Sequence, residues 1–168
     1  VLRELKITHE IVLHYEDAYE ATETSQPNAF EWIHKLEDGQ KDNGLDILSM
    51  EAHEDNRDGF AIRWMGKRLE NRAEAHKFLL VFSDGEPSAF GYAQNGIMDT
   101  AEAVLEQEQL GINVLHLFLN DREATEEQLN LFRLIFDKKS ATASSLEKFS
   151  EETLRLLRKM LHLVVQSS

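Results

Sequence analysis

The segment that decides the fold spans residues 77–87 and reads KFLLVFSDGEP. Its first seven residues are mostly apolar, without the alternation of polar side chains that marks a half-exposed strand. Such a run is typical of a strand buried on both faces of a parallel sheet. Asp84 and Gly85 follow it as a turn-forming pair. We therefore expect a buried strand over Lys77–Ser83, the most buried of the sheet, with Asp84 at its carboxyl end.

Strand-like and helix-like patterns alternate on both sides of this segment. Further strands are expected at residues 10–15, 45–50, 112–119 and, as a short edge strand, 140–144. Helices are expected where apolar residues recur at helical spacing: over 30–36 before Gly39, around 60–69, from 99 to Gly111, over 129–136 and over 146–164. This alternation predicts an α/β fold: a doubly wound, mostly parallel sheet flanked by helices. The length predicts one domain over residues 1–168.

Two details of these helices can be read from the sequence. The helix around 60–69 is expected to bury one face, made of Ala61, Trp64, Met65 and Leu69. Asp99 and Glu102 stand at the spacing of a capping box, which places the start of the next helix at Asp99, with Thr100 as an alternative cap.

Composition excludes several classes of function. The chain has 168 residues, with 18 Lys and Arg against 31 Asp and Glu, and a formal net charge of −13. This charge disfavours nucleic acid and anionic membrane surfaces. It suits cations or a basic protein partner, although an acidic surface kept for solubility is the commoner explanation. With no cysteine in the chain, disulfides, thiolate metal sites and cysteine nucleophiles are excluded. No apolar run approaches the ~20 residues that span a bilayer. We expect a cytoplasmic protein.

Acidic and hydroxyl side chains fall where ligands bind in open α/β sheets, outside the carboxyl ends of the strands. Ser83 and Asp84 end the Lys77–Ser83 strand, and Asp58 lies at the start of a helix. Such hard oxygen ligands suit Mg²⁺. The alternative reading is structural, since Asp58 could cap its helix and Asp84 could serve only as a turn residue.

Three other motifs fail on inspection. Glu54, Asn56, Asp58 and Gly59 imitate the start of a calcium-binding EF-hand loop, but Met65 stands where the bidentate Glu is required. His9 and His14 are five residues apart on an expected strand, so they face opposite sides rather than one zinc ion. Ser83 lacks a nucleophile-elbow motif and has no His or acid as an evident partner. We interpret His76 and His116 as packing or surface residues, and we expect no catalytic residue.

An ordered set of residues resembles a known family. The set comprises residues 56–59 (NRDG), 61–63 (AIR), 77–87, 96–100 (GIMDT) and 111–112 (GI). It is similar to the von Willebrand factor A domains of bacterial nitric oxide reductase activation proteins and of the related aerobic cobaltochelatase subunit. The resemblance covers about residues 45–120.

The resemblance implies a metal-ion-dependent adhesion site (MIDAS), in which Mg²⁺ (or Mn²⁺) joins the domain to an acidic group on a partner. Asp58 and Asp84 match two of the family's three ligand segments, and Ser83 adjoins Asp84. The partner-binding rim would be Glu86, Pro87 and Ser88. The implied role is that of a non-enzymatic adaptor, acting with a MoxR-type AAA+ ATPase that assembles or activates a metalloenzyme. The alternative is a subunit of a metal chelatase or a Mg²⁺-dependent hydrolase.

The family's remaining ligand segment, an Asp-x-Ser-x-Ser strand end, does not occur in this sequence. By the resemblance, the family's first strand would precede Val1, and the domain would be incomplete at its N-terminus. A sheet without that strand exposes unpaired backbone groups. A homodimer formed through the exposed sheet is therefore one expectation, and weakened metal binding is another.

Overall fold

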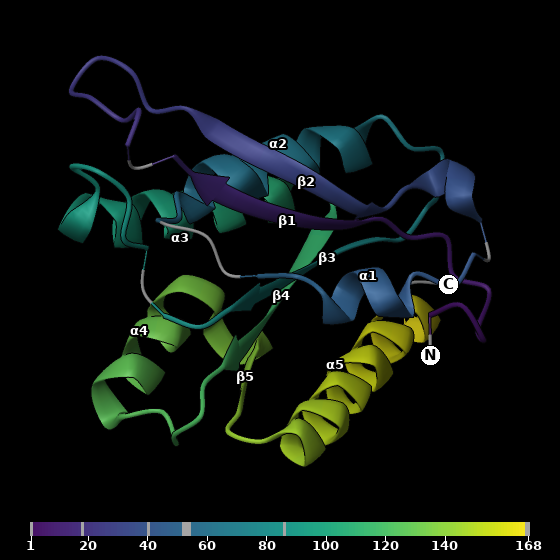
Figure 1. Ribbon diagram of the computed structural model, residues 1–168. Coiled ribbons are helices and arrows are strands. Elements are labelled where there is room, and N and C mark those ends of the chain that lie inside the picture. Colours follow the sequence, from purple (N-terminus) through teal and green to yellow (C-terminus); the bar gives the residue numbers. More distant parts are fainter. Residues whose placement is uncertain (1, 18, 40, 52–54, 86, 167–168) are drawn as a thin grey trace. The chain divides into compact units, whose positions relative to one another are not determined.

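The chain folds into two units in the computed structural model, which describes residues 2–17, 19–39, 41–51, 55–85 and 87–166 (Figure 1). Unit 1 consists of Val1–Arg57 and Ser88–Gly91, and unit 2 consists of Asp58–Pro87 and Tyr92–Ser168. The chain therefore leaves unit 2 after Pro87 and returns to it at Tyr92. That residues 1–168 form one domain stays a prediction.

Unit 1 is built on an antiparallel pair of strands. β1 (Ile11–Glu16) pairs with β2 (Asn28–His34). The expected strand at 10–15 is thus confirmed to within one residue, whereas the helix expected over 30–36 is wrong. Phe30 packs its ring 6.4 Å from that of His14 on the facing strand. Cross-strand packing therefore overrides the helical spacing of the apolar residues.

The strand expected at 45–50 is also wrong. The short helix α1 (Gly44–Leu48) lies there, preceded by the 3-10 turn η1 (Leu36–Asp38). The backbone N–H of Ile47 donates to the carbonyl of Asn43 at 3.0 Å, which closes a helical turn. Leu45 is 83% exposed, so its apolar side chain does not mark a sheet interior.

Unit 2 contains a parallel sheet of three strands in the order β3-β4-β5. The strands are β3 (Lys77–Ser83), β4 (Ile112–Leu119) and β5 (Ser140–Ala143). All three were expected from the sequence and are confirmed, with β5 ending one residue earlier. Unit 2 is thus a mixed α/β structure with helices flanking a parallel sheet, an arrangement compatible with a Rossmann-like fold.

β4, and not β3, is the most buried strand. Six of the eight β4 residues are buried, whereas no described β3 residue is, and Phe82 is 46% exposed. The physical reason is the strand order, because β4 has a strand on each side and β3 has one neighbour within the described sheet. An apolar run predicted the strand correctly but not its place in the sheet.

The helices of unit 2 are α2 (Asp58–Glu70), α3 (Ala93–Gln109), α4 (Glu126–Phe136) and α5 (Leu146–Gln166), with the 3-10 turn η2 (Asp137–Lys139) after α4. One core cluster joins α2, α3 and α4 to β4; its buried members are Ile62, Ala103, Val104, Val114, Ile135 and Phe136. The buried face of α2 differs from the expected one, since Ile62 and Gly66 are buried beside Ala61 while Trp64, Met65 and Leu69 are only partly so. α3 begins at Ala93 and not at Asp99.

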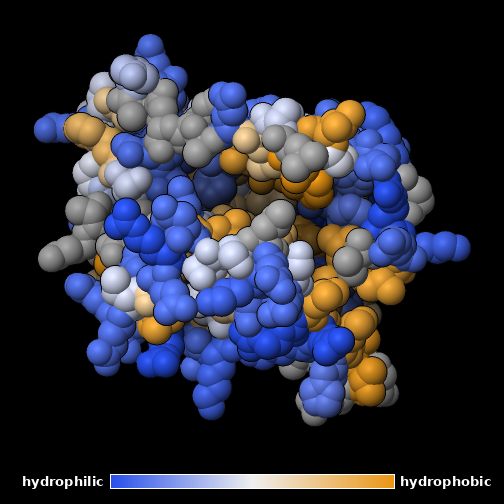
Figure 2. All heavy atoms as spheres, turned by 60° about the horizontal axis from the view of Figure 1, so that its bottom comes forward, coloured by the Kyte–Doolittle hydropathy of each residue, from blue (hydrophilic) through white to orange (hydrophobic). Residues whose placement is uncertain are grey.

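None of the described helices is both long and apolar enough to cross a membrane. α5 nevertheless exposes the apolar side chains of Leu154, Leu161 and Val165. Figure 2 shows apolar residues reaching the surface among the hydrophilic residues that cover most of this face.

Candidate functional site

The carboxyl end of β3 carries two of the predicted site residues side by side. Ser83 is the last residue of β3 and is partly buried, and Asp84 follows it in an exposed turn. This is the position at which open α/β sheets bind ligands. The structure therefore places Ser83 and Asp84 where the sequence predicted them.

Ser83 has a histidine partner that sequence reasoning missed. Its Oγ lies 2.9 Å from Nε2 of His116 on β4, and Nδ1 of the same ring lies 2.9 Å from Oγ of Ser140 on β5. His116 is 1% exposed and stacks on the Phe136 ring at a centroid distance of 4.2 Å. The earlier inference that no His is placed beside Ser83 is wrong. Strand register, which pairs Val81 and Ser140 with His116, could not be read from the sequence.

Burial sets the protonation state of His116. Desolvation lowers the pKa of its imidazole to about 4, because burial disfavours the charged form. The ring is therefore neutral at pH 7, with one nitrogen donating and the other accepting. One of the two serine hydroxyls donates to His116 and the other accepts from it.

Asp58, the third predicted ligand, is the first residue of α2 and is 6% exposed. Its expected place at a helix start is confirmed. A carboxylate in the first turn interacts favourably with the helix dipole. The next residue, Gly59, donates its N–H to the phenolic oxygen of Tyr92 at 3.2 Å.

A network of polar side chains connects α2 with α3 near the start of α2. The Tyr92 hydroxyl donates to Oδ2 of Asp99, and Arg63 donates to Oδ1 of Asp99 at 2.6 Å and to Glu106 at 2.7 Å. Burial, followed by the Asp99 carboxylate, raises the pKa of Tyr92 above its usual value. Bonds to Glu106 and Asp99 likewise raise the pKa of Arg63. Tyr92 therefore stays a phenol, and Arg63 stays charged.

The network explains why Asp99 does not begin a helix. Its carboxylate is engaged by Tyr92 and Arg63 from the side of α3 that faces α2, so it is unavailable as a cap. A Cβ on Gly59 would lie 2.1 Å from Oδ2 of Asp99, so only glycine permits this approach. One signal was available in the sequence: Asp99 and Glu106 are two turns apart and lie on one face of a helix.

The predicted rim is divided between the units. Glu86 lies outside the described residues, Pro87 is buried at the end of a unit 2 segment, and Ser88 is exposed in unit 1. Ser88 Oγ donates to Oδ1 of Asn56 at 2.8 Å. That these three residues form a partner-binding rim stays a prediction.

Two further bonds fix residues 88–91 within unit 1. Glu16, whose side chain is fully buried, accepts from Arg57 Nε at 2.5 Å and from the Phe90 N–H at 2.9 Å. Arg57 also donates to the Phe90 carbonyl at 2.9 Å. The segment that follows the predicted rim is therefore held to the end of β1.

The comparisons with known proteins give one relative. No protein-family profile matches the chain. The chain is 44% identical over 162 residues to the Bacillus subtilis (strain 168) protein named "Uncharacterized protein YojO". The alignment covers 96% of this chain and 25% of YojO, so the chain spans about a quarter of that relative's length. This similarity does not identify an activity.

The donor set can be tested against a hard cation. Ser83, Asp84 and Asp58 offer only oxygen atoms, which fit Mg²⁺ or Mn²⁺, and Mg²⁺ commonly keeps several waters beside one or two carboxylates. Within the described parts of the chain, no group of three or more His, Asp or Glu side chains is gathered closely enough to hold a metal ion. The oxygen donors thus match a hard cation in their chemistry, but the described residues do not form an all-protein cage.

Proposed function

We propose that the chain is a non-enzymatic protein-interaction domain of the von Willebrand factor A type. Its site would hold Mg²⁺ or Mn²⁺ through Asp84 and Asp58, with Ser83 beside them, and the ion would take an acidic group of the partner as a further ligand. The partner class proposed from the resemblance is a MoxR-type AAA+ ATPase that assembles or activates a metalloenzyme.

The observation that carries this proposal is the position of Asp84. It follows the last residue of a parallel strand and is exposed, so its carboxylate can reach a cation that is also open to a partner. The Asp-x-Ser-x-Ser segment of a MIDAS does not occur in the sequence, and water or another polypeptide segment would have to complete the coordination shell.

The chemistry around Ser83 favours an adaptor over a hydrolase. A general base works best with a pKa near the operating pH, and the pKa of His116 is lowered to about 4. The second nitrogen of His116 is bonded to Ser140 rather than to a carboxylate. Ser83 and His116 therefore lack the third, charged member that supports a serine nucleophile.

The first test is Mn²⁺ binding by isothermal calorimetry to the chain and to Asp84→Asn, Asp58→Asn and Asp121→Asn. Asp121 is the matched control because its carboxylate is also exposed beyond the carboxyl end of a strand, with a side chain 83% exposed. We expect Asp84→Asn and Asp58→Asn to weaken binding by about tenfold or more and Asp121→Asn to leave it unchanged.

Equal loss in all three variants would show general attraction of cations to an acidic surface, and absence of binding by the parent chain would overturn the metal site. The partner is tested by retention of a MoxR-type ATPase on the immobilised chain in Mg²⁺ and in EDTA. Retention that is the same in both solutions would contradict bridging by a cation.

A further inference from the structure

The outer edge of β5 is unpaired within the described residues of unit 2. β5 is the last strand in the order β3-β4-β5 and pairs with β4 alone. On the β4 side, the Ala143 carbonyl accepts from the Asn120 N–H at 3.2 Å. Backbone groups of alternate residues point to opposite edges of a strand in a parallel sheet. Ser140 and Thr142 therefore direct their N–H and C=O groups to the outer edge.

A hollow of about 430 Å³ lies along this edge. α4 and α5 both contact β5 and lie on either side of it (Figure 1). We call this hollow the β5 edge groove; it is lined by Leu129, Phe132, residues 140–142 and Arg155, among others. The small side chains of β5, which reads SATA, leave the space open.

Basic residues cluster in two chain segments that contribute to the β5 edge groove, in an otherwise acidic chain. Segments 133–139 and 155–159 contain six of the 18 Lys and Arg residues and one Asp, a formal charge of +5. The remaining residues carry 12 positive and 30 negative charges, so their formal charge is −18. Added to the +5 of the two segments, this gives the net charge of −13 for the whole chain. These two short segments are thus net basic, whereas the rest of the chain is net acidic.

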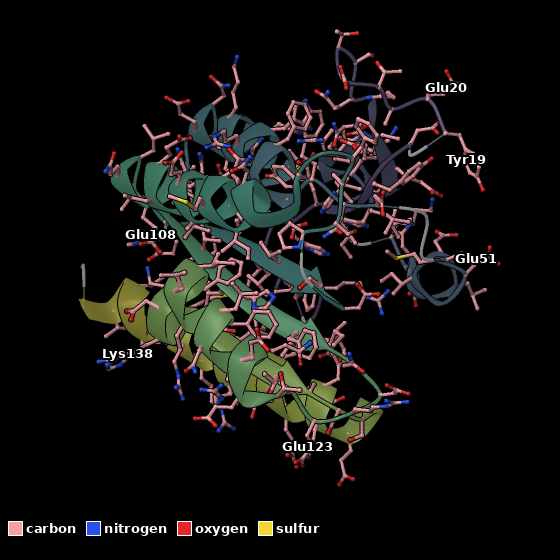
Figure 3. All side chains as sticks on the ribbon, turned by 90° about the vertical axis from the view of Figure 1, so that its left-hand side faces the viewer. Tyr19, Glu20, Glu51, Glu108, Glu123 and Lys138 are labelled. Carbon is pink, nitrogen blue, oxygen red and sulfur yellow. The ribbon has the colours of Figure 1, made fainter. Side chains whose placement is uncertain are left out.

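Three of these basic side chains, Arg133, Lys138 and Arg155, line the groove itself, together with two acidic ones, Asp137 and Glu152. Arg155 is paired with Glu152 at 2.6 Å, and the neighbouring Lys139 is paired with Glu108 at 2.5 Å. Lys138 is exposed and extends from the ribbon in Figure 3.

Burial and neighbouring cations both act on the ammonium group of Lys159. The pKa of Lys159 is lowered by burial first and then by the nearby charges of Arg155 and Lys139. Like charges held this close repel one another, and a bound anionic group relieves that repulsion.

Edge strands are normally protected by charges on the strand, by proline, by a bulge or by a covering segment. β5 has no charged residue or proline of its own, and its backbone opens into a groove with an apolar floor at Leu129 and Phe132. Addition of an extended peptide to such an edge supplies backbone hydrogen bonds, while side-chain contacts supply specificity.

We propose that the β5 edge groove binds an extended acidic segment of a partner protein as an additional strand of the sheet. Ser140 and Thr142 would supply the backbone hydrogen bonds, and Arg133 and Lys138 would attract alternate acidic side chains. The groove lining has three basic and two acidic side chains, and this small excess of positive charge favours an acidic occupant over a basic one. This site is separate from Asp58 and Asp84 and does not depend on a metal.

The test uses a fluorescent peptide of about eight residues in which Glu and Val alternate, with a Lys-Val peptide as the control for charge. Binding is followed by fluorescence anisotropy in EDTA, so that a failure of the metal site cannot affect the result. We expect the acidic peptide to bind, the basic peptide not to bind, and hydrogen exchange of the Thr142 amide to slow in the complex.

Two variants separate backbone pairing from charge. Thr142→Pro removes an outward N–H at an edge position where proline is tolerated, and Thr142→Val keeps that N–H as its control. The double variant Arg133→Glu/Lys138→Glu reverses the rim charge, and Arg122→Glu, whose parent side chain is 88% exposed, controls for net charge. Thr142→Pro and the double variant should each weaken binding by about tenfold or more, and the two controls should change it little.

Circular dichroism and urea unfolding establish that each variant is folded. If Thr142→Pro does not fold, the proposal is tested by the Arg133→Glu/Lys138→Glu variant and by hydrogen exchange of the Thr142 amide. Unchanged affinity in a folded Thr142→Pro, or equal binding of the Lys-Val peptide, would overturn the proposal. Full displacement of the peptide by inorganic phosphate would also overturn the proposal, because it would indicate a simple anion site. Concentration-dependent dimerisation that the acidic peptide abolishes would overturn it as well, because it would assign the edge to a second copy of the chain.

Discussion

His116 shows how much one buried polar residue can connect. Its two ring nitrogens reach Ser83 on β3 and Ser140 on β5, while its ring face packs on Phe136. Buried polar groups are costly when unpaired, and here both nitrogens are paired. The residue therefore ties together all three strands of the parallel sheet close to the carboxyl end of β3.

The pH dependence of stability should report this burial. An ordinary histidine in the unfolded chain takes up a proton near pH 6.5, whereas folded His116 does so only near pH 4. The unfolded state therefore binds more protons between these values, and folding stability falls as the pH is lowered from about 6.5 to 4. The loss is about 1.4 kcal/mol per pH unit and about 3 kcal/mol in total.

Urea unfolding of the parent chain and of His116→Gln, measured from pH 7 to pH 4.5, checks this expectation. His116→Gln does not titrate, so other groups cancel in the difference between the two proteins. The advantage of the parent chain should shrink as the medium becomes acidic. Parallel curves for the two proteins would show that His116 is not held neutral by burial.

Among the elements, the crossing of α2 and α3 depends on glycine. A Cβ on Gly66 would lie 1.8 Å from Oε1 of Gln107, whose side-chain oxygen is buried without a hydrogen-bond partner in the structure. Arg63 bonds to Asp99 and Glu106 on the same face. The two helices therefore approach through glycine and are fixed in register by a shared arginine.

Gly66→Ala should destabilise the protein, although alanine normally favours a helix interior by about 1 kcal/mol over glycine. The added methyl group meets Gln107, and overpacking costs about 1–3 kcal/mol. In a Gln107→Ala background the clash is absent, and Gly66→Ala should then be neutral or stabilising. Chemical unfolding of the four proteins forms a double-mutant cycle. A coupling energy near zero would contradict a direct contact.

The sequence predicts an element correctly where its hydrophobic pattern and the turn residues at its ends indicate the same structure. The runs over 77–83 and 112–119 are apolar and bounded by turn residues, and both are strands. The strand at residues 28–34 differs from the expected helix because Phe30, Ile33 and Leu36 fit a helical spacing, while pairing with β1 depends on residues outside that local pattern. α1 is too short for a periodic pattern.

The candidate site was predictable only in part, for a similar reason. Asp84 and Asp58 could be placed because each follows or begins an element that local pattern defines. Tyr92, Arg63 and His116 could not, because their partners depend on helix packing and strand register. No local pattern carries that information.

At the scale of the whole molecule, the distribution of charge is the dominant feature. A formal charge of −13 implies mutual repulsion among acidic side chains, which opposes the folded state. Glu20 and Glu51, both exposed, belong to this acidic surface (Figure 3). Local ion pairs such as Arg63 with Glu106 act in the opposite direction.

We expect the melting temperature to rise by a few degrees when NaCl is increased from about 0.02 M to about 0.2 M. Salt should screen the repulsion more than it weakens the partly buried ion pairs. The double variant Glu20→Gln/Glu51→Gln carries less charge and should show a smaller rise, which differential scanning calorimetry can resolve. A fall in melting temperature would show that ion pairs outweigh the repulsion.

The bond between Arg57 and Phe90 has a consequence for the order of assembly on the ribosome. Unit 1 obtains its last segment from residues 88–91, and Phe90 is synthesised 33 residues after Arg57. Until then, the buried carboxylate of Glu16 lacks the Phe90 N–H that it accepts in the finished protein. Unit 1 therefore cannot be completed before β3 has been synthesised. The nascent N-terminal part must wait for a strand of the other unit, and a stop or cleavage between residues 57 and 88 leaves neither unit whole.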